Sequence, residues 1–264
     1  MRTTARAIQA LKQERPVVLI SAYDALWARL AESAGADILL VGDSVGIDVL
    51  GYGSVLPVSA EMLLHHLRAV VRGSSRALVV ADMPLGEYGI GDRETMHRAM
   101  QYVKEGGAGA IKMAGGSELA ESVRKLTKLG IPVMGHIGVN SSHWSLGEVG
   151  PVVGRTTAEQ QQLLSDAKAL EAAGVFALIA KCVTVSVTQE LCRMLRIPVI
   201  SIGSGDADGV GANCLDIVGL ARESPWFSLR QVNGGEWLVN AMTGFVDGVR
   251  SGTLSAKSWK EKSV

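Results

Sequence analysis

The 264-residue sequence lacks an excess of either charge, since 26 Lys and Arg residues balance 26 Asp and Glu residues. A general nucleic-acid binder needs surplus cations to neutralise phosphates, so this balance predicts no nucleic-acid partner. No apolar stretch reaches the roughly 20 residues that cross a bilayer, which predicts no membrane span. The polar, mixed-charge residues 1–16 also lack the apolar run of a signal peptide.

Cysteine and aromatic residues are also scarce. The three cysteines, Cys182, Cys192 and Cys214, are odd in number and include no C-x-x-C pair. They therefore indicate neither a disulfide framework nor a zinc ribbon, and they favour a reducing, cytoplasmic location. Aromatic residues make up only 5% of the chain and apolar residues 47%, so Val, Leu, Ile and Ala must build a large core.

The chain does contain a repeated alternation of short apolar runs and longer amphipathic stretches. Eight continuous apolar runs suit strands that are buried on both faces, as in a parallel sheet. The runs cover residues 17–21, 38–41, 77–81, 108–113, 131–135, 175–180, 197–202 and, most weakly, 215–220. Amphipathic stretches between them, such as residues 60–71 and 157–173, predict helices. Eight βα units in a chain of this length predict an α/β protein with a closed (β/α)8 TIM barrel.

No linker or low-complexity segment divides the chain, so we expect one domain over residues 1–264. The tail, residues 235–262, has the pattern of one or two helices, which we expect to pack outside the barrel. The active site of such a barrel lies at the carboxyl ends of its strands. The residues that end each apolar run are therefore the candidate site residues.

Two acidic residues, Asp43 and Asp82, directly follow apolar runs that should be neighbouring strands. Two carboxylates at one rim repel each other unless a cation lies between them. Mg2+ accepts one or two carboxylates and keeps waters or substrate oxygens as its other ligands, so the pair indicates a metal site. The alternative is that each Asp only caps the helix or turn that follows it.

Three further rim residues have both a functional and a structural interpretation. Lys112 lies inside an apolar run, where a Lys without a partner is costly, so it either meets a substrate anion or pairs with a neighbouring Asp. His136 either hydrogen-bonds a ligand or is a satisfied core histidine. Ser44 either offers its hydroxyl and N–H to an anion or caps the next helix.

Lys181 ends the very apolar run at residues 175–180. A desolvated amine can act as a base or as a Schiff-base nucleophile, which makes Lys181 the candidate catalytic residue. The alternative is a lysine whose head reaches water at the rim. Further along, Gly203-Ser-Gly205 with Gly209 and Gly211 indicates a glycine-rich turn, and many barrels bind phosphate in this region.

A set of rim motifs runs in order over nearly the whole chain. They are Ser21-Ala-Tyr-Asp24, Leu40-Val-Gly-Asp-Ser44, Leu56-Pro-Val58, Ala81-Asp-Met-Pro84, Ile111-Lys-Met-Ala-Gly-Gly116, Gly135-His-Ile-Gly138 and Ile202-Gly-Ser-Gly205. Single motifs of this kind are weak, but their joint order and spacing are specific. Together they resemble the ketopantoate hydroxymethyltransferase (3-methyl-2-oxobutanoate hydroxymethyltransferase) family.

The resemblance implies a barrel of the phosphoenolpyruvate/pyruvate-type superfamily, which handles enolates of 2-oxo acids. It implies transfer of a one-carbon unit from 5,10-methylenetetrahydrofolate to 3-methyl-2-oxobutanoate, on the pathway to pantothenate. In the family, Mg2+ holds the 2-oxo acid and stabilises its enolate. The matching metal positions are Asp43 and Asp82, and Ser44 and Lys112 match positions that bind the substrate carboxylate. Bacterial members are large homo-oligomers, commonly decamers.

The chain departs from the family pattern at two acidic positions. Ala114 stands where the family has a Glu that helps to hold the metal site, and Lys181 stands where the family has the Glu that acts as base. Leu215 also replaces a His, and Tyr52 replaces the His of a Gly-His pair. Lys181 then either replaces the base directly or forms an imine with the 2-oxo group.

These features lead to one main hypothesis and two alternatives. The main hypothesis is a hydroxymethyltransferase-like enzyme that forms a C–C bond on a small 2-oxo acid through a metal-stabilised enolate. The first alternative is a repurposed aldolase or lyase that uses Lys181 as base or Schiff-base residue. The second is a non-catalytic paralogue that binds a ligand.

Overall fold

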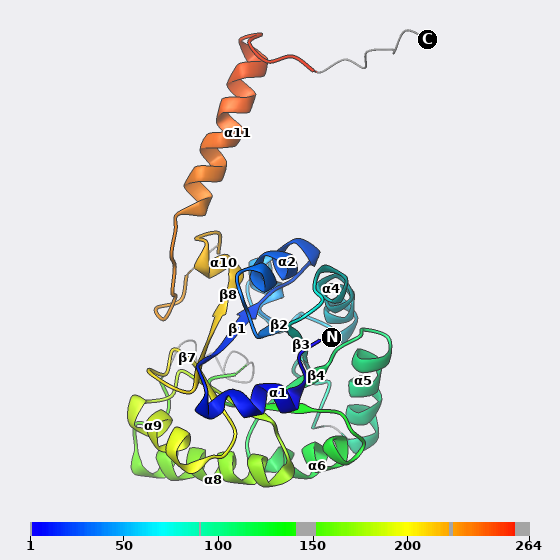
Figure 1. Ribbon diagram of the computed structural model, residues 1–264, viewed down its shortest axis with the longest axis vertical. Coiled ribbons are helices and arrows are strands. Elements are labelled where there is room, and N and C mark those ends of the chain that lie inside the picture. The colour runs from blue at the N-terminus through cyan, green and yellow to red at the C-terminus, as the bar shows by residue number, and fades with distance from the viewer. Residues whose placement is uncertain (1, 90, 141–151, 222–223, 257–264) are drawn as a thin grey trace.

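Eight parallel strands form a closed barrel in the order β1 to β8 (Figure 1). The computed structural model describes residues 2–89, 91–140, 152–221 and 224–256. The strands are β1 (Val17–Ser21), β2 (Ile38–Val41), β3 (Leu78–Asp82), β4 (Ala110–Ala114), β5 (Val133–Gly138), β6 (Ala177–Lys181), β7 (Val199–Ile202) and β8 (Gly209–Asn213). Each strand pairs in parallel with the next, and β8 closes the ring on β1. The predicted (β/α)8 barrel is confirmed.

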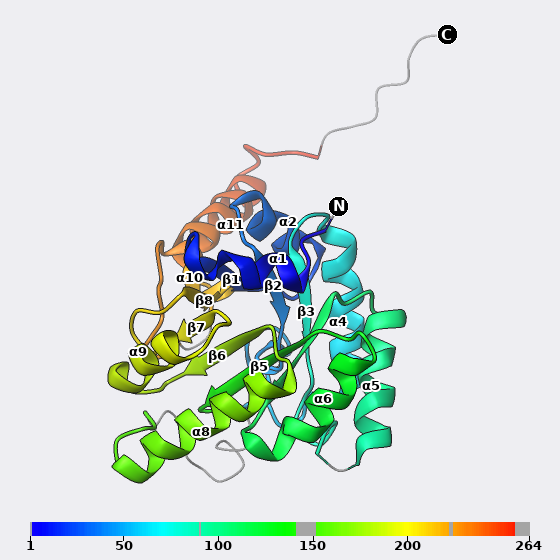
Figure 2. The ribbon, with the colours of Figure 1, turned by 60° about the horizontal axis from the view of Figure 1, so that its bottom comes forward.

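Helices α4, α5, α6, α8 and α9 lie around the outside of the barrel (Figure 2). The helical elements within the described residues are α1 (Ala5–Ala10), η1 (Leu11–Gln13), α2 (Ala25–Ser33), α3 (Val45–Asp48), α4 (Ala60–Gly73), α5 (Asp92–Lys104), η2 (Ser117–Leu119), α6 (Ala120–Lys128), α8 (Thr157–Ala173), α9 (Val185–Met194), α10 (Cys214–Ile217) and α11 (Gly234–Arg250). Helix α1 closes the amino-terminal end of the barrel, because its Ile8 is fully buried among interior side chains such as Val17 and Ala177.

Side chains along each strand alternate between the barrel interior and the exterior that the helices cover. Leu19, Val80 and Ile179 belong to one buried apolar cluster inside the barrel, whereas Val79 and Ala180 belong to a larger cluster beneath the helices. Apolar side chains thus fill the amino-terminal and middle parts of the interior. The next inward position on several strands falls at the carboxyl end, and the inward residues there are polar.

The eighth strand differs from the sequence prediction. It precedes the apolar run at residues 215–220, which instead contributes to α10, and it occupies part of the expected glycine-rich turn. Two of its inward positions are glycines because the neighbouring strands come close. A Cβ on Gly209 would lie 2.4 Å from the carbonyl oxygen of Val17, and one on Gly211 would lie 3.0 Å from Ile202. β8 therefore lacks the apolar pattern by which the other strands are predicted.

The outer face of the β1–β8 pair is exposed. Val18 and Val210 are register partners in the two strands and are 41% and 43% exposed. By contrast, outward side chains elsewhere in the barrel, such as Val79, Ile111 and Leu178, are buried beneath helices. The barrel thus has an apolar strip of sheet that lacks the cover given to the other strands.

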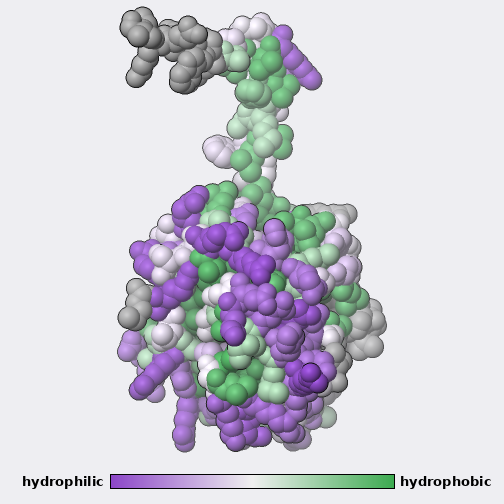
Figure 3. All heavy atoms as spheres, turned by 90° about the vertical axis from the view of Figure 1, so that its right-hand side faces the viewer, coloured by the Kyte–Doolittle hydropathy of each residue, from purple (hydrophilic) through white to green (hydrophobic). Residues whose placement is uncertain are grey.

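The C-terminal tail differs from the expected packing. Helix α11 extends away from the barrel (Figure 1), and none of its residues is buried. The apolar side chains of Trp237, Met242 and Phe245 are more than half exposed and contribute to a hydrophobic surface along the projecting stem (Figure 3). An amphipathic pattern predicts that a helix has a face to bury, but it does not say on which surface. No helix in the described part of the chain is long and apolar enough to cross a membrane.

Candidate active site at the mouth of the barrel

Polar side chains occupy the carboxyl-terminal mouth of the barrel. Most lie two positions beyond an inward residue of the same strand, so strand alternation directs them into the mouth. These inward residues are Ser21 on β1, Asp82 on β3, Lys112 on β4, His136 on β5, Lys181 on β6 and Asn213 on β8. Asp43 and Ser44 follow β2 at the same end. The structure therefore brings every predicted site residue to one end of the barrel.

Lys112 donates a hydrogen bond to Oδ2 of Asp82 at 2.7 Å, and both side chains are buried. The two residues are register partners on β3 and β4, which explains why they meet. The same carboxylate oxygen accepts the backbone N–H of Asp43 at 3.3 Å. Lys112 thus has a carboxylate partner within the protein, and its ammonium has further hydrogens with which to bind a ligand anion.

Asp43 and Asp82 form a pair of interacting carboxylates. Burial raises the pKa of Asp82 to about 6 against the opposing effect of the Lys112 ammonium, and the negative charge of Asp43 raises this pKa further. Such a donor set fits Mg2+, which binds through one or two carboxylates and completes its shell with water and substrate oxygens. Among the described residues, no group of three His, Cys, Asp or Glu side chains could hold a metal, and Ala114 offers no side-chain ligand.

A chain of hydrogen bonds connects β1, β8 and α3 at the same mouth. Oγ of Ser44 lies 2.7 Å from the hydroxyl oxygen of Tyr23, and the Tyr23 hydroxyl lies 3.2 Å from Oδ2 of Asp48. The side-chain amide of Asn213 donates to that same carboxylate oxygen. Ser44 precedes α3, but its side chain makes no capping hydrogen bond there. The hydroxyl therefore does not have the simple capping role that the sequence left open.

Tyr23, Asp48 and Asn213 are not among the residues predicted from the sequence. Tyr23 does lie in the motif after the first apolar run, and an aromatic hydroxyl next to a buried strand end is a signal that points to it. Asn213 ends β8, the strand that the apolar pattern misplaces, so its position at the mouth is visible only in the closed barrel.

His136 is buried, and its Nε2 lies 3.1 Å from the carbonyl oxygen of Val139. A carbonyl only accepts, so Nε2 carries the hydrogen and donates it, which fixes the orientation of the ring. This hydrogen bond is what the interpretation of His136 as a core histidine requires. The inward position of His136 on β5 also places the ring at the mouth, where the ligand-binding interpretation requires it.

Tyr88 contacts the backbone of Ala114 at the end of β4. Its hydroxyl donates to the Ala114 carbonyl oxygen at 2.7 Å and accepts the Ala114 N–H at 3.3 Å. Burial raises the pKa of this phenol, and the charge of Asp82 raises it further, so Tyr88 is neutral. The end of β4 thus presents a methyl group and a neutral phenol.

Lys181 ends β6 with its side chain directed into the mouth and partly exposed. It forms no ion pair with any residue in the described parts of the chain. Burial raises the pKa of Asp48, and the positive charge of Lys181 acts against that effect. Lys181 is therefore an amine at the mouth, within electrostatic range of Asp48 and available to a ligand.

The glycine-rich segment around Ser204 supports the end of β6. Ser204 is buried, accepts the N–H of Val183 at 2.9 Å and donates to the carbonyl oxygen of Ala180 at 2.8 Å. Between these two residues, Cys182 has a φ of 51°, a left-handed conformation that is uncommon for a residue with a side chain. The segment predicted as a glycine-rich turn thus holds the backbone that presents Lys181.

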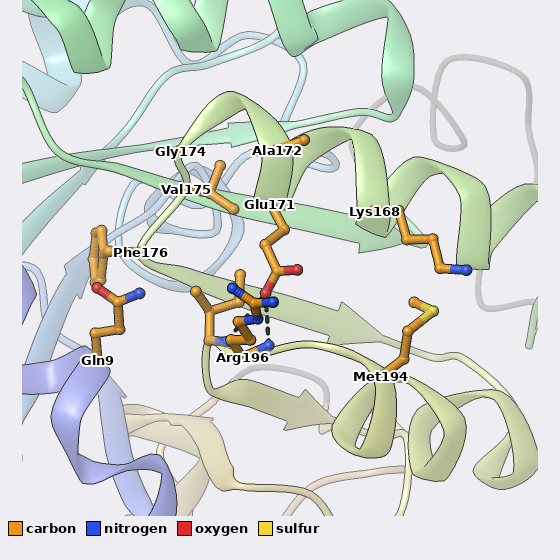
Figure 4. Close-up of a pocket in the computed structure, with 10 residues that line it drawn as sticks. Gln9, Lys168, Glu171, Ala172, Gly174, Val175, Phe176, Met194 and Arg196 are labelled. Carbon is orange, nitrogen blue, oxygen red and sulfur yellow. Dashed lines mark hydrogen bonds between the residues drawn. The ribbon is translucent and has the colours of Figure 1, made fainter.

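A surface cavity of about 560 Å³ lies at the opposite end of the barrel (Figure 4). It is lined by Gln9 of α1 and by Phe176 and Ile197, which precede β6 and β7. Glu171 in this cavity accepts the backbone N–H of Arg196 at 2.6 Å. The lining includes none of the mouth residues, so this cavity is separate from the candidate site.

A closed parallel barrel with carboxylates, amines and an imidazole at the carboxyl ends of its strands defines the class, a (β/α)8-barrel protein with an enzyme-type site at its mouth. Solved structures share this fold at low sequence identity. The chain matches phosphoenolpyruvate phosphomutase from Streptomyces platensis subsp. rosaceus with a TM-score of 0.60 and 17% identity, covering 95% of this chain and 88% of that one. It matches 2,3-dimethylmalate lyase, a PEP mutase/isocitrate lyase superfamily member, with a TM-score of 0.57 and 15% identity, covering 99% and 92%. These matches support the barrel fold that the sequence predicts.

Sequence comparison identifies the family. The family model of ketopantoate hydroxymethyltransferase matches residues 2–257. The chain is 42% identical over 254 residues to the 3-methyl-2-oxobutanoate hydroxymethyltransferase of Carboxydothermus hydrogenoformans, covering 94% of this chain and 91% of the relative. It is 39% identical over 250 residues to the enzyme of the same name from Ignicoccus hospitalis, covering 94% of each. The chain belongs to the ketopantoate hydroxymethyltransferase family.

Proposed function

We propose that the protein transfers a hydroxymethyl group to a small 2-oxo acid, 3-methyl-2-oxobutanoate, and so forms a C–C bond in pantothenate biosynthesis. The observation that carries the proposal is the convergence of Asp43, Asp82, Lys112 and Ser44 at one barrel mouth. The supporting comparison is 42% identity with a relative named for that activity.

The chemistry begins with loss of the proton at C3 of the 2-oxo acid. The electron pair left behind spreads onto the keto oxygen, and positive charge fixed beside that oxygen stabilises the enolate where its charge develops. In this proposal the Lys112 ammonium and the Ser44 hydroxyl bind the substrate carboxylate. His136 contributes an oriented ring at the mouth.

Asp43 and Asp82 would hold a Mg2+ ion in this mechanism. When bound, the ion supplies a Lewis-acidic positive charge at the keto oxygen. The assignment is supported by the raised pKa of Asp82, to which burial contributes most and the charge of Asp43 adds, because a cation relieves the repulsion between two carboxylates. The one-carbon donor is proposed to be 5,10-methylenetetrahydrofolate, which rests on family membership alone.

Lys181 is proposed to remove the C3 proton, since it occupies the place of the family base and points into the mouth. A neutral amine accepts the proton and becomes an ammonium. The alternative reaction is attack of the amine on the keto carbon with loss of water, and the resulting imine then draws the electron pair from C3. That route would make the protein a repurposed aldolase or lyase, and the inward position of the amine supports it equally.

The test is exchange of the C3 proton of 3-methyl-2-oxobutanoate in D2O, followed by NMR with Mg2+ and with EDTA. Exchange that requires Mg2+ supports Lys181 as base with a metal-stabilised enolate. Exchange that persists in EDTA, together with a borohydride-trapped adduct on Lys181, supports the imine. Absence of exchange in both samples contradicts the proposal and favours the ligand-binding paralogue. Addition of 5,10-methylenetetrahydrofolate and detection of ketopantoate test the donor.

We further propose that the protein is a homo-oligomer in which α11 of one copy covers the exposed β1–β8 face of another. Leu238, Met242, Phe245 and Val249 recur at helical spacing and form one apolar stripe along α11. A (β/α)8 barrel ordinarily has a helix after β8 that packs outside the barrel. Here only the short helix α10 directly follows β8, the next helix α11 leaves the barrel, and the β1–β8 strip stays exposed.

The two unpaired surfaces match in chemistry. Val18 and Val210 are apolar and exposed on the sheet, and α2, which follows β1, exposes Leu26 and Leu30 one turn apart. A second copy is the occupant that supplies an apolar helix and an apolar strip at once, so each copy can satisfy its neighbour. The decamer that the family resemblance implies is one size that such exchange can reach. A cytoplasmic location is proposed on the free state of all three cysteines.

A further inference from the structure

The Tyr23 hydroxyl has two hydrogen-bond partners but a single hydrogen. Its oxygen lies 2.7 Å from Oγ of Ser44 and 3.2 Å from Oδ2 of Asp48, so it can donate to only one of them at a time. The Asn213 amide is fixed, because its Oδ1 accepts the Leu215 N–H at 3.0 Å and its nitrogen must therefore face Asp48. The protonation state of Asp48 thus determines which group donates in each hydrogen bond from Asp48 through Tyr23 to Ser44.

Two arrangements of hydrogens satisfy this geometry. When Asp48 is ionised it can only accept, so Tyr23 donates to Asp48 and Ser44 donates to Tyr23, which turns the Ser44 hydrogen away from the mouth. When Asp48 is protonated it donates to Tyr23, and Tyr23 donates to Ser44. The Ser44 hydrogen is then available to a ligand carboxylate. Only the second arrangement lets Ser44 act as a donor to an anion.

We propose that Tyr23 and Asp48 are positioning residues that set the direction in which the Ser44 hydroxyl donates, so that the mouth takes up a proton when it binds a carboxylate anion. The inference rests on the proposed function in that it concerns how the same mouth holds a 2-oxo acid. It adds that the affinity for a carboxylate anion depends on pH, and it gives a role to the hydrogen bonds that link Asp48, Tyr23 and Ser44.

The surroundings of Asp48 permit such a change of charge. Burial raises the pKa of Asp48, the hydrogen bonds that it accepts lower it, Asp216 raises it and Lys181 lowers it. Burial also raises the pKa of Tyr23, so the phenol relays the hydrogen while staying neutral. Cys214 is neutral as well, since burial raises the pKa of its thiol to about 12. These are the titratable groups that face Asp48 from β1, β6, β8 and α10.

The experiment uses oxalate as the probe and titration calorimetry in MgCl2 as the readout. Repeating the titration in buffers of different ionisation enthalpy, across the acidic to neutral range, counts the protons taken up per oxalate bound. The wild-type protein should take up protons, and its affinity should fall by up to about tenfold per pH unit once most of Asp48 is ionised, because only the protonated fraction is competent. Asp48→Asn should bind oxalate weakly and without this part of the pH dependence, since the fixed Asn213 nitrogen faces the carbonyl oxygen of the new amide and Tyr23 then donates to that oxygen at every pH.

Tyr23→Phe separates the relay from simple repulsion between Asp48 and the anion. It keeps the Asp48 carboxyl but removes the link to Ser44, so we expect the proton uptake assigned to Asp48 to disappear. Wild-type proton uptake in Tyr23→Phe, or an unchanged pH dependence in Asp48→Asn, overturns the proposal. Because Tyr23 is fully buried, thermal unfolding checks its variant, and the near-isosteric Asp48→Asn decides the question alone if Tyr23→Phe does not fold.

Asp24→Asn is the matched control, since Asp24 is exposed, adjoins Tyr23 and lies outside the chain of hydrogen bonds. It should behave as the wild type. Oxalate also separates this inference from the proposed function. Coupled proton uptake with oxalate, in a protein that fails to exchange 3-methyl-2-oxobutanoate, supports the relay and contradicts the function. A mouth that binds no oxalate overturns the relay.

Discussion

The Lys112 ammonium and the Asp82 carboxylate share a buried hydrogen bond of 2.7 Å between register partners of β3 and β4. One residue of this pair is the proposed metal ligand, and the other is the proposed anchor of the substrate carboxylate. The pair therefore couples the position of the metal to the position of the substrate. The protonation state of the pair should therefore affect both metal binding and substrate binding.

Binding of Mg2+ should strengthen as the pH rises through about 6. Burial raises the pKa of Asp82 to about 6, so at lower pH a proton competes with the metal for this carboxylate. The affinity is measured by calorimetry with MgCl2 at a series of pH values. Asp82→Asn should abolish binding, whereas Asp206→Asn, which changes an exposed acid, should leave it intact. An affinity that is flat across this range contradicts the assignment.

Lys112→Met should lower the free energy of unfolding by about 3–5 kcal/mol at neutral pH, because it leaves a buried carboxylate without its cation. The folded-state pKa of Asp82 is already raised above its usual value and would rise further. Ionising Asp82 then costs stability, so the loss should grow as the pH rises and shrink as the pH falls. Urea denaturation at two pH values measures it.

The double variant Lys112→Met with Asp82→Asn is the control for this effect. It removes both charges, so much of the lost stability should return. If the double variant is as unstable as the single one, the cost comes from lost packing and not from an uncompensated charge.

Glu32→Gln should destabilise the protein at neutral pH by about 1–3 kcal/mol, since a charged acceptor of backbone hydrogen bonds is lost. The Glu32 carboxylate accepts the N–H groups of Ser75, Arg76 and Ala77. Burial raises its pKa, but these bonds outweigh burial and lower the pKa to about 2. The stability that Glu32 contributes is therefore complete above pH 4.5 and is lost as the pH falls toward 2.

Acid titration of wild type and Glu32→Gln, followed by circular dichroism, checks this prediction. The two curves should differ most at neutral pH and converge in acid. Glu14→Gln, at an exposed position, should follow the wild type. Curves for wild type and Glu32→Gln that run parallel down to the lowest pH would show that the contribution of Glu32 does not depend on its charge.

Lys181→Gln should slow C3 proton exchange by about a hundredfold or more, the usual contribution of a positioned base. Lys181→Glu installs the family residue and should restore exchange when Mg2+ is present, because a carboxylate is also a base. Lys168→Gln is the matched control, since Lys168 lines the cavity at the opposite end of the barrel. Equal rates in wild type and Lys181→Gln would remove Lys181 from the mechanism.

Met242→Asp on α11 should reduce the assembly to smaller species, because it places a charge in the proposed helix-exchange interface. Val18→Asp, on the strip of sheet that α11 is proposed to cover, should do the same. Asn240→Asp adds the same charge on the opposite side of α11 and should leave the mass unchanged. Light scattering after gel filtration measures the mass. A wild-type monomer, or an unaltered mass in Met242→Asp, refutes the exchange.

The alternation of side chains along the strands explains why the sequence predicts most of the residues at the mouth. Asp82, His136 and Lys181 follow apolar runs and Lys112 lies near the end of one. Because side chains alternate along a strand, each of them points inwards once its strand is placed. The barrel and the location of its chemistry therefore follow from local pattern. Asp43 and Ser44 follow for the same reason, since they come directly after an apolar run.

Contacts that depend on closure of the barrel do not follow from local pattern. β8 needs glycine where it crowds against Val17 and Ile202, so its sequence carries no strand signal. Asn213 reaches Asp48 only because β8 pairs with β1. The destination of α11 does not follow from local pattern either, because the surface proposed to cover its stripe belongs to another copy of the chain.

Helix α11 buries none of its residues within its own chain, so the free energy available from covering its apolar stripe can be gained only through association. Folding and assembly are then linked by mass action, and the melting temperature should rise with protein concentration. Dilution would expose the β1–β8 strip and loosen the very strand that carries Asn213. In the proposed assembly, a mouth built partly on β8 would therefore respond to the concentration of the protein in the cell.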